Sequence, residues 1–347
     1  MESNPGEHSY QKKAWITGGI YALIIILILL FKATFSVFLL ILAGALIAIF
    51  FRGLSELVCR KTKWKPGICL TISVLGTLLL VAGISWLIGS KVQSQVAELT
   101  DSLPATVENA KAQLSKTSLG EKIIEKASSP KSMEKAQGLV RTFFKSTFGV
   151  FGDLYVVLFL GIFFTVSPGI YTKGIIQLIP KKGQDKGNDV LNKLGNNLKK
   201  WLKGKFFSMA VVMILTAVGL SIIGIRMWLV LAIIAGILNF IPNFGPLIAM
   251  IPAVLVALMQ GPGTAAIVAG LYILIQVVES NFITPLVQQR LISIPPALII
   301  IAQLLISPFS GGWGLVLATP LMLIIIILVQ ELYINERDRQ TQKHPGA

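Results

Sequence analysis

The sequence predicts an all-α, polytopic membrane protein of about eight membrane helices, judged by the lengths of its apolar runs. Hydrophobic residues make up 54% of the 347 residues and charged residues only 14%, against about 25% charged residues in soluble domains. The mean hydropathy is +0.75, and apolar runs of membrane-spanning length recur along the whole chain. These runs do not alternate between apolar and polar residues, which argues against a β-barrel.

The N-terminal region, residues 1–90, is expected to form three membrane helices. Residues 14–51 are apolar apart from Lys32 and too long for one span, so we predict two spans joined by a tight turn at Lys32. The first lacks a clear small-residue cleavage site and is expected to be a retained anchor. The loop at 52–65 holds five Lys and Arg residues against one acid, which predicts a cytoplasmic location. The third span is expected at 66–89.

Cysteine and histidine residues offer little chemistry. Cys59 and Cys69 flank the basic loop, where a disulfide is not expected because the cytoplasm is reducing. Two cysteines without nearby histidines also make a poor metal site, and His8 and His344 lie in the polar tails. We therefore expect no metal site, no cofactor and no catalytic residue.

The middle of the chain alternates between polar and apolar segments. Residues 91–146 are polar with apolar residues at helical spacing, which predicts amphipathic helices outside the cytoplasm; a solvated spacer is the alternative. A fourth span at 147–166 opens the next segment, 147–204. In residues 181–205 one helical face is apolar and the other is rich in lysine, which predicts an interfacial cytoplasmic helix.

Residues 205–333 are predicted to be the membrane-embedded transport core, followed by a cytoplasmic tail at 334–347. Between Phe206 and Gln330 only Arg226, Glu279 and Arg290 are charged. The core separates into five apolar pieces, at 206–225, 227–259, 264–289, 295–310 and 313–333.

The second of these pieces contains a break. Residues 227–242 and 247–259 hold about 16 and about 13 residues, whereas a helix needs about 20 to cross the bilayer. The two halves fit a re-entrant helical hairpin, since prolines lack the backbone donor and glycine permits a tight bend. The residues of this break are Pro242, Asn243, Gly245 and Pro246.

The last two pieces repeat this pattern. The break between 295–310 and 313–333 contains Pro308, Gly311 and Gly312, with Pro320 further on. A span followed by a broken hairpin would then occur twice in opposite orientations, the inverted repeat of secondary transporters. Eight spans with proline kinks and no re-entrance are the alternative.

Glu279 is the only acid between Asp189 and Glu331. It lies about 22 Å from the outer end of its predicted span, at about 1.5 Å per residue. A carboxylate at that depth is costly and usually faces a cavity or a partner, so it is a candidate for binding a substrate, a proton or a cation. A structural hydrogen bond to a neighbouring helix is the alternative.

The other candidate pathway residues are Gln276, Ser280, Asn281 and Pro285, and Asn243 at the first break. Pro285 frees the carbonyl of Asn281 for a ligand.

Three segments carry a resemblance to a known family: "NFIPNFGPLIAMIPAVLVAL", "QVVESNFITPLVQQRLISIPP" and "GGWGLVLATPL". In order and spacing they resemble the AI-2E family, the autoinducer-2 exporter family. The resemblance covers about residues 147–333 and implies an inner-membrane permease that forms homo-oligomers, with export of autoinducer-2 or sodium/proton antiport as activities. The family-type positions are Pro242, Gly245, Pro246, Glu279, Asn281, Pro285, Gly314 and Pro320. Asn239 stands where family members often have an acid, which makes coupling through several carboxylates less favoured.

The leading functional prediction is a secondary transporter of a small polar molecule, such as an autoinducer-2-like signal, coupled to protons or another ion. A sodium/proton antiporter is the alternative, and a structural scaffold that docks partners on residues 91–146 is a weaker one.

The expected partners are the substrate, membrane lipid and further copies of the chain. The net charge of +15 is explained by lysines beside membrane segments and not by nucleic acid. An enzyme is not expected, and the sequence contains no Walker motif for ATP hydrolysis. The predicted location is the bacterial inner membrane with both termini cytoplasmic.

Overall fold

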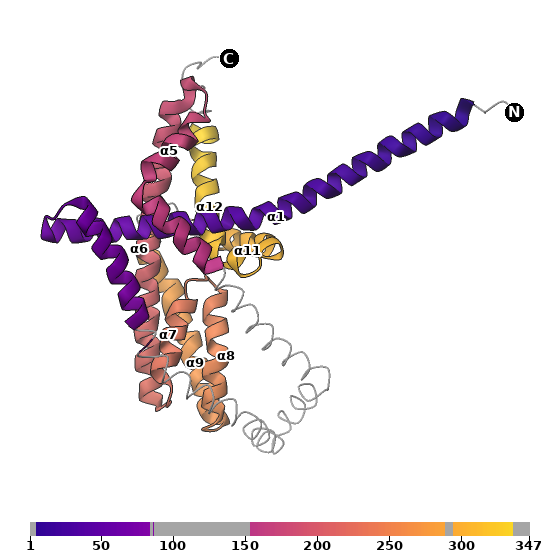
Figure 1. The fold of residues 1–347 in the computed structure, drawn as a ribbon. Helices are drawn as coiled ribbons and strands as arrows, with labels where there is room; N and C mark the ends of the chain where they lie inside the picture. The colour runs from indigo at the N-terminus through magenta and orange to yellow at the C-terminus, as the bar shows by residue number, and fades with distance from the viewer. Residues whose placement is uncertain (1–4, 84–85, 87–152, 289–293, 336–347) are drawn as a thin grey trace, which may run out of the picture.

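The computed structural model describes residues 5–83, 86, 153–288 and 294–335. Within these residues all regular structure is helical (Figure 1). The elements in chain order are α1 (Pro5–Thr62), a helix at Pro66–Gly83, a helix at Asp153–Val166, α5 (Pro168–Gln177), η1 (Lys181–Gly183), α6 (Gln184–Ile223), α7 (Trp228–Leu238), α8 (Phe244–Leu258), α9 (Pro262–Val278), η2 (Glu279–Ile283), α10 (Thr284–Gln288), α11 (Pro296–Ser310), α12 (Gly312–Val329) and η3 (Gln330–Ile334). The two longest helices, α1 and α6, cross and contact each other.

The N-terminal helix differs from the expectation of two spans. α1 is one continuous helix of 58 residues, so the predicted turn at Lys32 is wrong. After Pro5 the segment contains no proline, and most of its residues are good or moderate helix formers, so a single lysine gives the helix no reason to stop.

The turn after α1 brings the two cysteines together. Lys63 has a φ of 56°, and the next helix begins at Pro66. Cys59 and Cys69 form a disulfide with their Cα atoms 5.5 Å apart, so the expectation of no disulfide is wrong. That expectation rested on the compartment alone, and it did not foresee that the tight turn meets the geometric requirement for the bond.

A sharp bend follows the predicted fourth span. The helix Asp153–Val166 ends where the sequence suggested, and α5 leaves it at an angle of 87°. Pro168 begins α5, the position where a proline is tolerated because its missing N–H would have no helical partner. The start of the predicted span and the whole 91–146 segment lie outside the described residues.

α6 joins two segments that the sequence analysis kept apart. It runs for 40 residues without interruption, so the predicted interfacial helix and the fifth span are one helix. The apolar face predicted for its first half includes Leu198, Trp201 and Leu202, which are buried in a core shared with α1 and α12. The face therefore packs against protein, and the prediction that it rests on the membrane interface is wrong. α6 ends at Ile223, and the next residue, Gly224, has a left-handed φ of 82°, as is common for a glycine at a helix C-terminus.

Two hydrophobic cores occupy the two halves of α6. The first lies among α1, the first half of α6, α11 and α12. The second lies among the second half of α6, α7, α8 and α9, which run side by side in Figure 1. The two cores meet near the middle of α6, and the candidate site lies there.

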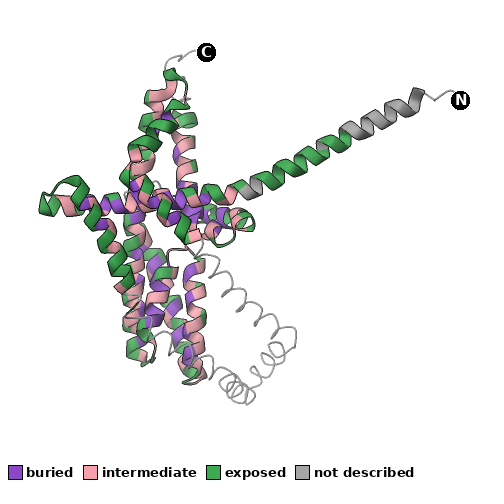
Figure 2. Ribbon diagram, viewed as in Figure 1, coloured by how far each residue is buried: buried purple, intermediate pink, exposed green. Residues whose placement is uncertain are grey.

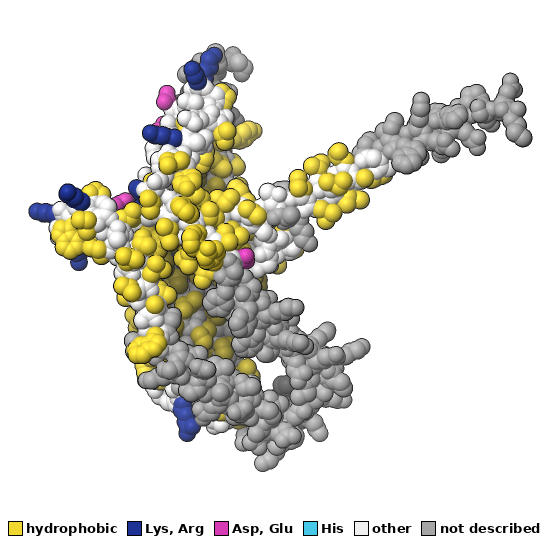
Figure 3. Space-filling model, in the orientation of Figure 1, with side chains coloured by type: hydrophobic (Ala, Val, Ile, Leu, Met, Phe, Trp, Pro, Cys, Tyr) yellow, Lys and Arg dark blue, Asp and Glu magenta, His cyan; other side chains and the backbone are white. Residues whose placement is uncertain are grey.

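The outer surface is strongly apolar. The residues of α1 at 17–19 and 21–30 are all exposed (Figure 2); Leu23, Ile26 and Leu29 are each about 60% exposed there. Hydrophobic side chains spread over the surface in Figure 3, while Lys and Arg gather at its extremities. Five helices in the described part of the chain are long and apolar enough to cross a membrane, or six if the bent pair is one span. Since lipid tails accept such surfaces and water does not, the chain is a multi-pass helical membrane protein.

Candidate functional site

A cavity of about 380 Å³ lies at the middle of α6, between the two cores. Its wall is formed by α6, the α7–α8 connection, the α9–η2–α10 segment and the α11–α12 pair. The lining residues are Trp201, Gly204, Lys205, Ser208, Pro242, Asn243, Gln276, Glu279, Ser280, Thr284, Pro285, Ile294, Pro296, Ile299, Thr319 and Leu323. The size suits a small molecule or a hydrated ion.

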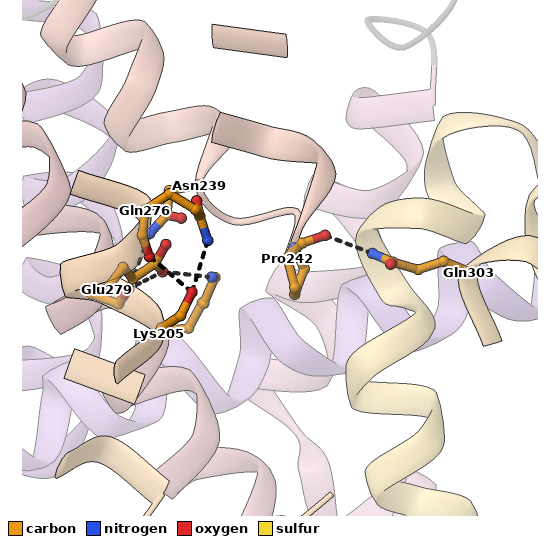
Figure 4. Close-up of polar contacts among 8 residues, drawn as sticks. Lys205, Asn239, Pro242, Gln276, Glu279 and Gln303 are labelled. Carbon is orange, nitrogen blue, oxygen red and sulfur yellow. Dashed lines mark hydrogen bonds and ion pairs between the residues drawn. The ribbon is translucent and has the colours of Figure 1, made fainter. Parts of the chain in front are cut away.

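Glu279 is the centre of a buried polar cluster on this wall (Figure 4). The residue is 6% exposed, and its Oε1 accepts a hydrogen bond of 2.7 Å from the hydroxyl of Ser208. The Lys205 ammonium lies 3.9 Å from the same oxygen, and the Asn239 amide donates to the Ser208 hydroxyl at 3.0 Å. A lone membrane acid is thus held by a cation and a short chain of hydrogen bonds, which offsets part of the cost of its burial.

The helix that carries Glu279 changes its winding at that residue. η2 is a π-helix, and the N–H of Thr284 donates to the Glu279 carbonyl five residues earlier. Pro285 has no N–H to donate to the carbonyl of Asn281, so the ordinary α-helical ladder is already interrupted there. Single π-turns of this kind occur often at functional sites, and this one places Glu279, Ser280, Thr284 and Pro285 on one cavity wall.

Of the other predicted pathway residues on this helix, Gln276 and Ser280 face the cavity and Asn281 does not. Gln276 and Ser280 line the cavity and bond to each other, with the Gln276 amide donating to the Ser280 hydroxyl at 3.1 Å. The Oε1 of Gln276 is buried without a hydrogen-bond partner. Asn281 instead is exposed and donates to the carbonyl of Val277 at 2.8 Å, so its side chain does not join the cluster around Glu279.

The first helix break is a tight turn between α7 and α8. Asn243 has φ 66° and ψ −49°, and the N–H of Phe244 donates to the Pro242 carbonyl at 2.8 Å. This is a γ-turn with positive φ, a rare and strained conformation. A Cβ on Gly245 would lie 1.9 Å from the carbonyl oxygen of Leu238, so only glycine fits. Pro246 lies in the first turn of α8, where a proline costs no hydrogen bond.

The second break is narrower than predicted. α11 continues through Pro308 to Ser310, and α12 begins at Gly312, so Gly311 alone separates them, with a φ of 59°. A Cβ on Gly314 would lie 2.6 Å from the hydroxyl oxygen of Ser310, which explains a glycine in the first turn of α12. Pro320 lies within α12.

The two helix pairs are not equal halves of a repeat. α7 and α8 have 11 and 15 residues, too few to cross a bilayer, which takes about 20. α11 is also short, but the helix Gly312–Ile334 is long enough to cross on its own. The second pair is therefore a short helix followed by one long enough to cross, whereas both helices of the first pair are short, so the two pairs do not match as the expected repeat of broken hairpins requires.

The partners of Glu279 were not among the residues predicted from the sequence. Lys205 and Ser208 come from α6, and Lys205 was assigned to the lysine-rich face of an interfacial helix. Their spacing of three residues places both on one face of α6, which was an available signal. Asn239 was noted only as a departure from the family pattern. No local pattern marks Gln303, which is fully buried on α11.

A further acidic side chain lies near the second break. Asp153 accepts a hydrogen bond of 2.8 Å from the Trp313 indole N–H, which joins the helix Asp153–Val166 to the first turn of α12. Among the residues that the structure describes, no group of three His, Cys, Asp or Glu side chains could hold a metal ion. The polar chemistry of the site rests on the Lys205–Glu279 pair and its neutral neighbours.

A cavity between broken helices, with a buried ion pair on its wall, is an arrangement typical of membrane transporters. Comparison with protein families supports that class: the family model described as AI-2E family transporter matches residues 20–334. The chain belongs to the AI-2E transporter family.

Curated relatives carry names of the same kind. The chain is similar to "Putative transport protein YrrI" of Bacillus subtilis (strain 168), with 25% identity over 157 residues, 45% of this chain and 44% of the relative. It is also similar to "Putative permease PerM" of Escherichia coli (strain K12), with 26% identity over 175 residues, 50% of each chain. The match to "Putative transport protein YueF" of Bacillus subtilis (strain 168) is 25% identical over 168 residues, 47% of this chain and 46% of the relative. The chain spans half the length, or slightly less, of these relatives.

Proposed function

We propose that the chain is a secondary transporter that moves a small polar solute through the cavity beside Glu279, coupled to a proton or another cation. The observation that carries this proposal is the buried Lys205–Glu279 pair on the cavity wall. A buried ion pair adds little to stability compared with apolar packing. Ionisable groups inside membrane helices are expensive, and they mark ion and substrate pathways.

The geometry of the pair suits a change of partner. The Lys205 ammonium and the Glu279 oxygen are 3.9 Å apart, longer than an ion-paired hydrogen bond of about 2.8 Å. A proton or cation that binds Glu279 removes the attraction for Lys205 and leaves the ammonium available to a solute. The site then has two charge states with different affinities for the solute, which is the requirement for coupling.

The proposed solute is a small molecule such as an autoinducer-2-like signal, moved outward. Support comes from the cavity volume of about 380 Å³, from its hydrogen-bonding groups and from the resemblance to the exporter family. Sodium/proton antiport is the second candidate. The observation that favours it is the set of oxygen atoms near Glu279, including the Gln276 oxygen that has no donor, because oxygen ligands suit hard cations.

The proposed orientation places the C-terminus and the basic turn after α1 in the cytoplasm of a bacterium, and the protein in its inner membrane. The expectation that the N-terminus shares this side depended on the turn at Lys32, which α1 does not make. Two ion pairs support a shared side: Lys199 with Glu56, near the end of α1, and Lys193 with Glu331, near the end of α12. The basic turn after α1, the first half of α6 and the end of α12 are therefore neighbours. The positive-inside rule assigns a side so rich in lysine and arginine to the cytoplasm.

The test compares cells that express the unaltered chain, Glu279→Gln or Glu56→Gln at equal membrane levels. Glu56 is the matched control, because it also pairs with a lysine but its side chain is 66% exposed. Untargeted mass spectrometry of the medium should show a compound exported with the unaltered chain and the control but not with Glu279→Gln. Equal export by Glu279→Gln would remove Glu279 from the mechanism. If none of the three chains exports a compound, sodium-driven proton flux in proteoliposomes distinguishes antiport from the absence of transport.

A further inference from the structure

Gln303 is a buried amide that links the first helix break to the α11–α12 pair. It is completely inaccessible to solvent, although its neighbours on α11, Ile299 and Ile306, belong to or pack on an apolar core. Its Nε2 donates to the Pro242 carbonyl at 3.0 Å and to the Leu315 carbonyl of α12 at 3.4 Å. Figure 4 shows the side chain extending from α11 to the α7–α8 turn.

The carbonyl that Gln303 contacts is the acceptor of the strained turn. The oxygen of Pro242 already receives the N–H of Phe244, which closes the γ-turn around Asn243. Strained backbone of this kind persists only where surrounding groups hold it. Gln303 supplies a second donor to the same oxygen, and it does so from a different helix pair.

An amide at this buried position is unfavourable unless its hydrogen bond to the Pro242 carbonyl stabilises the structure. Its Oε1 is buried without a hydrogen-bond partner, which is unfavourable because a buried acceptor has lost its water. A leucine or methionine would fill the same space with no unmet acceptor. The contribution that only the amide makes is the pair of donated bonds.

From this geometry we infer that Gln303 is a positioning residue that fixes the α7–α8 turn to the α11–α12 pair. Pro242 and Asn243 line the cavity and Gln303 does not. The cavity wall at the first break therefore moves together with α11 and α12. The inference deepens the proposed function, because this cavity is the proposed transport site, but the contact itself can be tested without a substrate.

Hydrogen–deuterium exchange with mass spectrometry tests the contact on the purified full chain in lipid nanodiscs. Gln303→Met keeps the length of the side chain and removes its donors. The amides of residues 240–245, including Phe244, should exchange about tenfold faster, the factor expected for one lost hydrogen bond. Amides in the middle of α9, around Val268, should keep their rate.

Two further variants keep the result interpretable. Gln276→Met removes an amide that lines the cavity but bonds to Ser280, so it should leave residues 240–245 unchanged. Gln303→Asn keeps an amide but shortens the side chain by one methylene, so its donor no longer reaches the Pro242 carbonyl. It should give the same faster exchange at residues 240–245, and it replaces Gln303→Met as the test if Gln303→Met does not fold. Unchanged exchange at residues 240–245 in both Gln303 variants, or an equal increase throughout α9, would overturn the inference. Normal export by Glu279→Gln would contradict the proposed function and leave this contact intact.

Discussion

The energetic coupling between Lys205 and Glu279 can be measured by removing each charge separately and then both together. At 3.9 Å and an effective dielectric constant of about 20, two unit charges attract by about 4 kcal/mol. Both side chains are largely buried, 11% and 8% exposed, so solvent screens this attraction little. Glu279→Gln retains an oxygen that can accept the Ser208 hydroxyl, and Lys205→Met retains the aliphatic stem.

Each single substitution is expected to lower the free energy of unfolding by about 3–5 kcal/mol, because it leaves a buried charge without its partner. The double variant should lose much less than the sum of the two, since neither charge remains. The expected interaction energy is about 3 kcal/mol. Unfolding of the purified protein by SDS titration, followed by tryptophan fluorescence, gives all four free energies.

The exposed pair between Glu56 and Lys199 provides the control cycle. The side chain of Glu56 is 66% exposed, so the coupling of that pair should be at most about 1 kcal/mol. Additive losses in the Lys205–Glu279 cycle would refute the reasoning, because they would show that the two groups do not interact as charges.

One substitution and one chemical treatment test other parts of the fold. Gly245→Ala places a Cβ 1.9 Å from a backbone oxygen and should cost about 3 kcal/mol or more, or prevent folding; Gly270→Ala, where nothing lies within 4 Å of the added Cβ, should be neutral or slightly stabilising in the same SDS titration. Reduction of the Cys59–Cys69 disulfide should lower the free energy of unfolding by about 2–3 kcal/mol; an identical unfolding midpoint with and without dithiothreitol would contradict this.

Much of the fold follows from local patterns in the sequence. The apolar runs and the scarcity of charge indicate membrane helices, because both depend on composition over about 20 residues. The proline, asparagine and glycine residues after α7 mark a turn for a similar local reason. The turn predicted at Lys32 failed because span length alone was taken to divide the helix, and α1 continues past that residue.

The composition of the site was less predictable, because it depends on contacts between distant segments. Glu279 attracted attention as a lone acid in a membrane helix, and Gln276 and Ser280 lie beside it along the chain. Ser208 is 71 residues from Glu279 in the sequence, and Gln303 is 61 residues from Pro242. The three-residue spacing of Lys205 and Ser208 places them on one face of α6 but does not indicate which segment that face meets. Nothing local in the sequence singles out Gln303.

The π-helix at Glu279–Ile283 also bears on how this segment tolerates changes in length. A π-turn holds one residue more than an α-helical turn, so it absorbs a single-residue insertion into a regular helix. Deleting one residue from η2 would restore α-helical winding and keep the residues after it in phase with α9, so Thr284 and Pro285 would still line the cavity. The same deletion inside α9 would instead rotate everything after it by about 100° relative to the start of that helix. Related chains that keep this cavity should therefore tolerate a one-residue difference in length at η2 but not within α9.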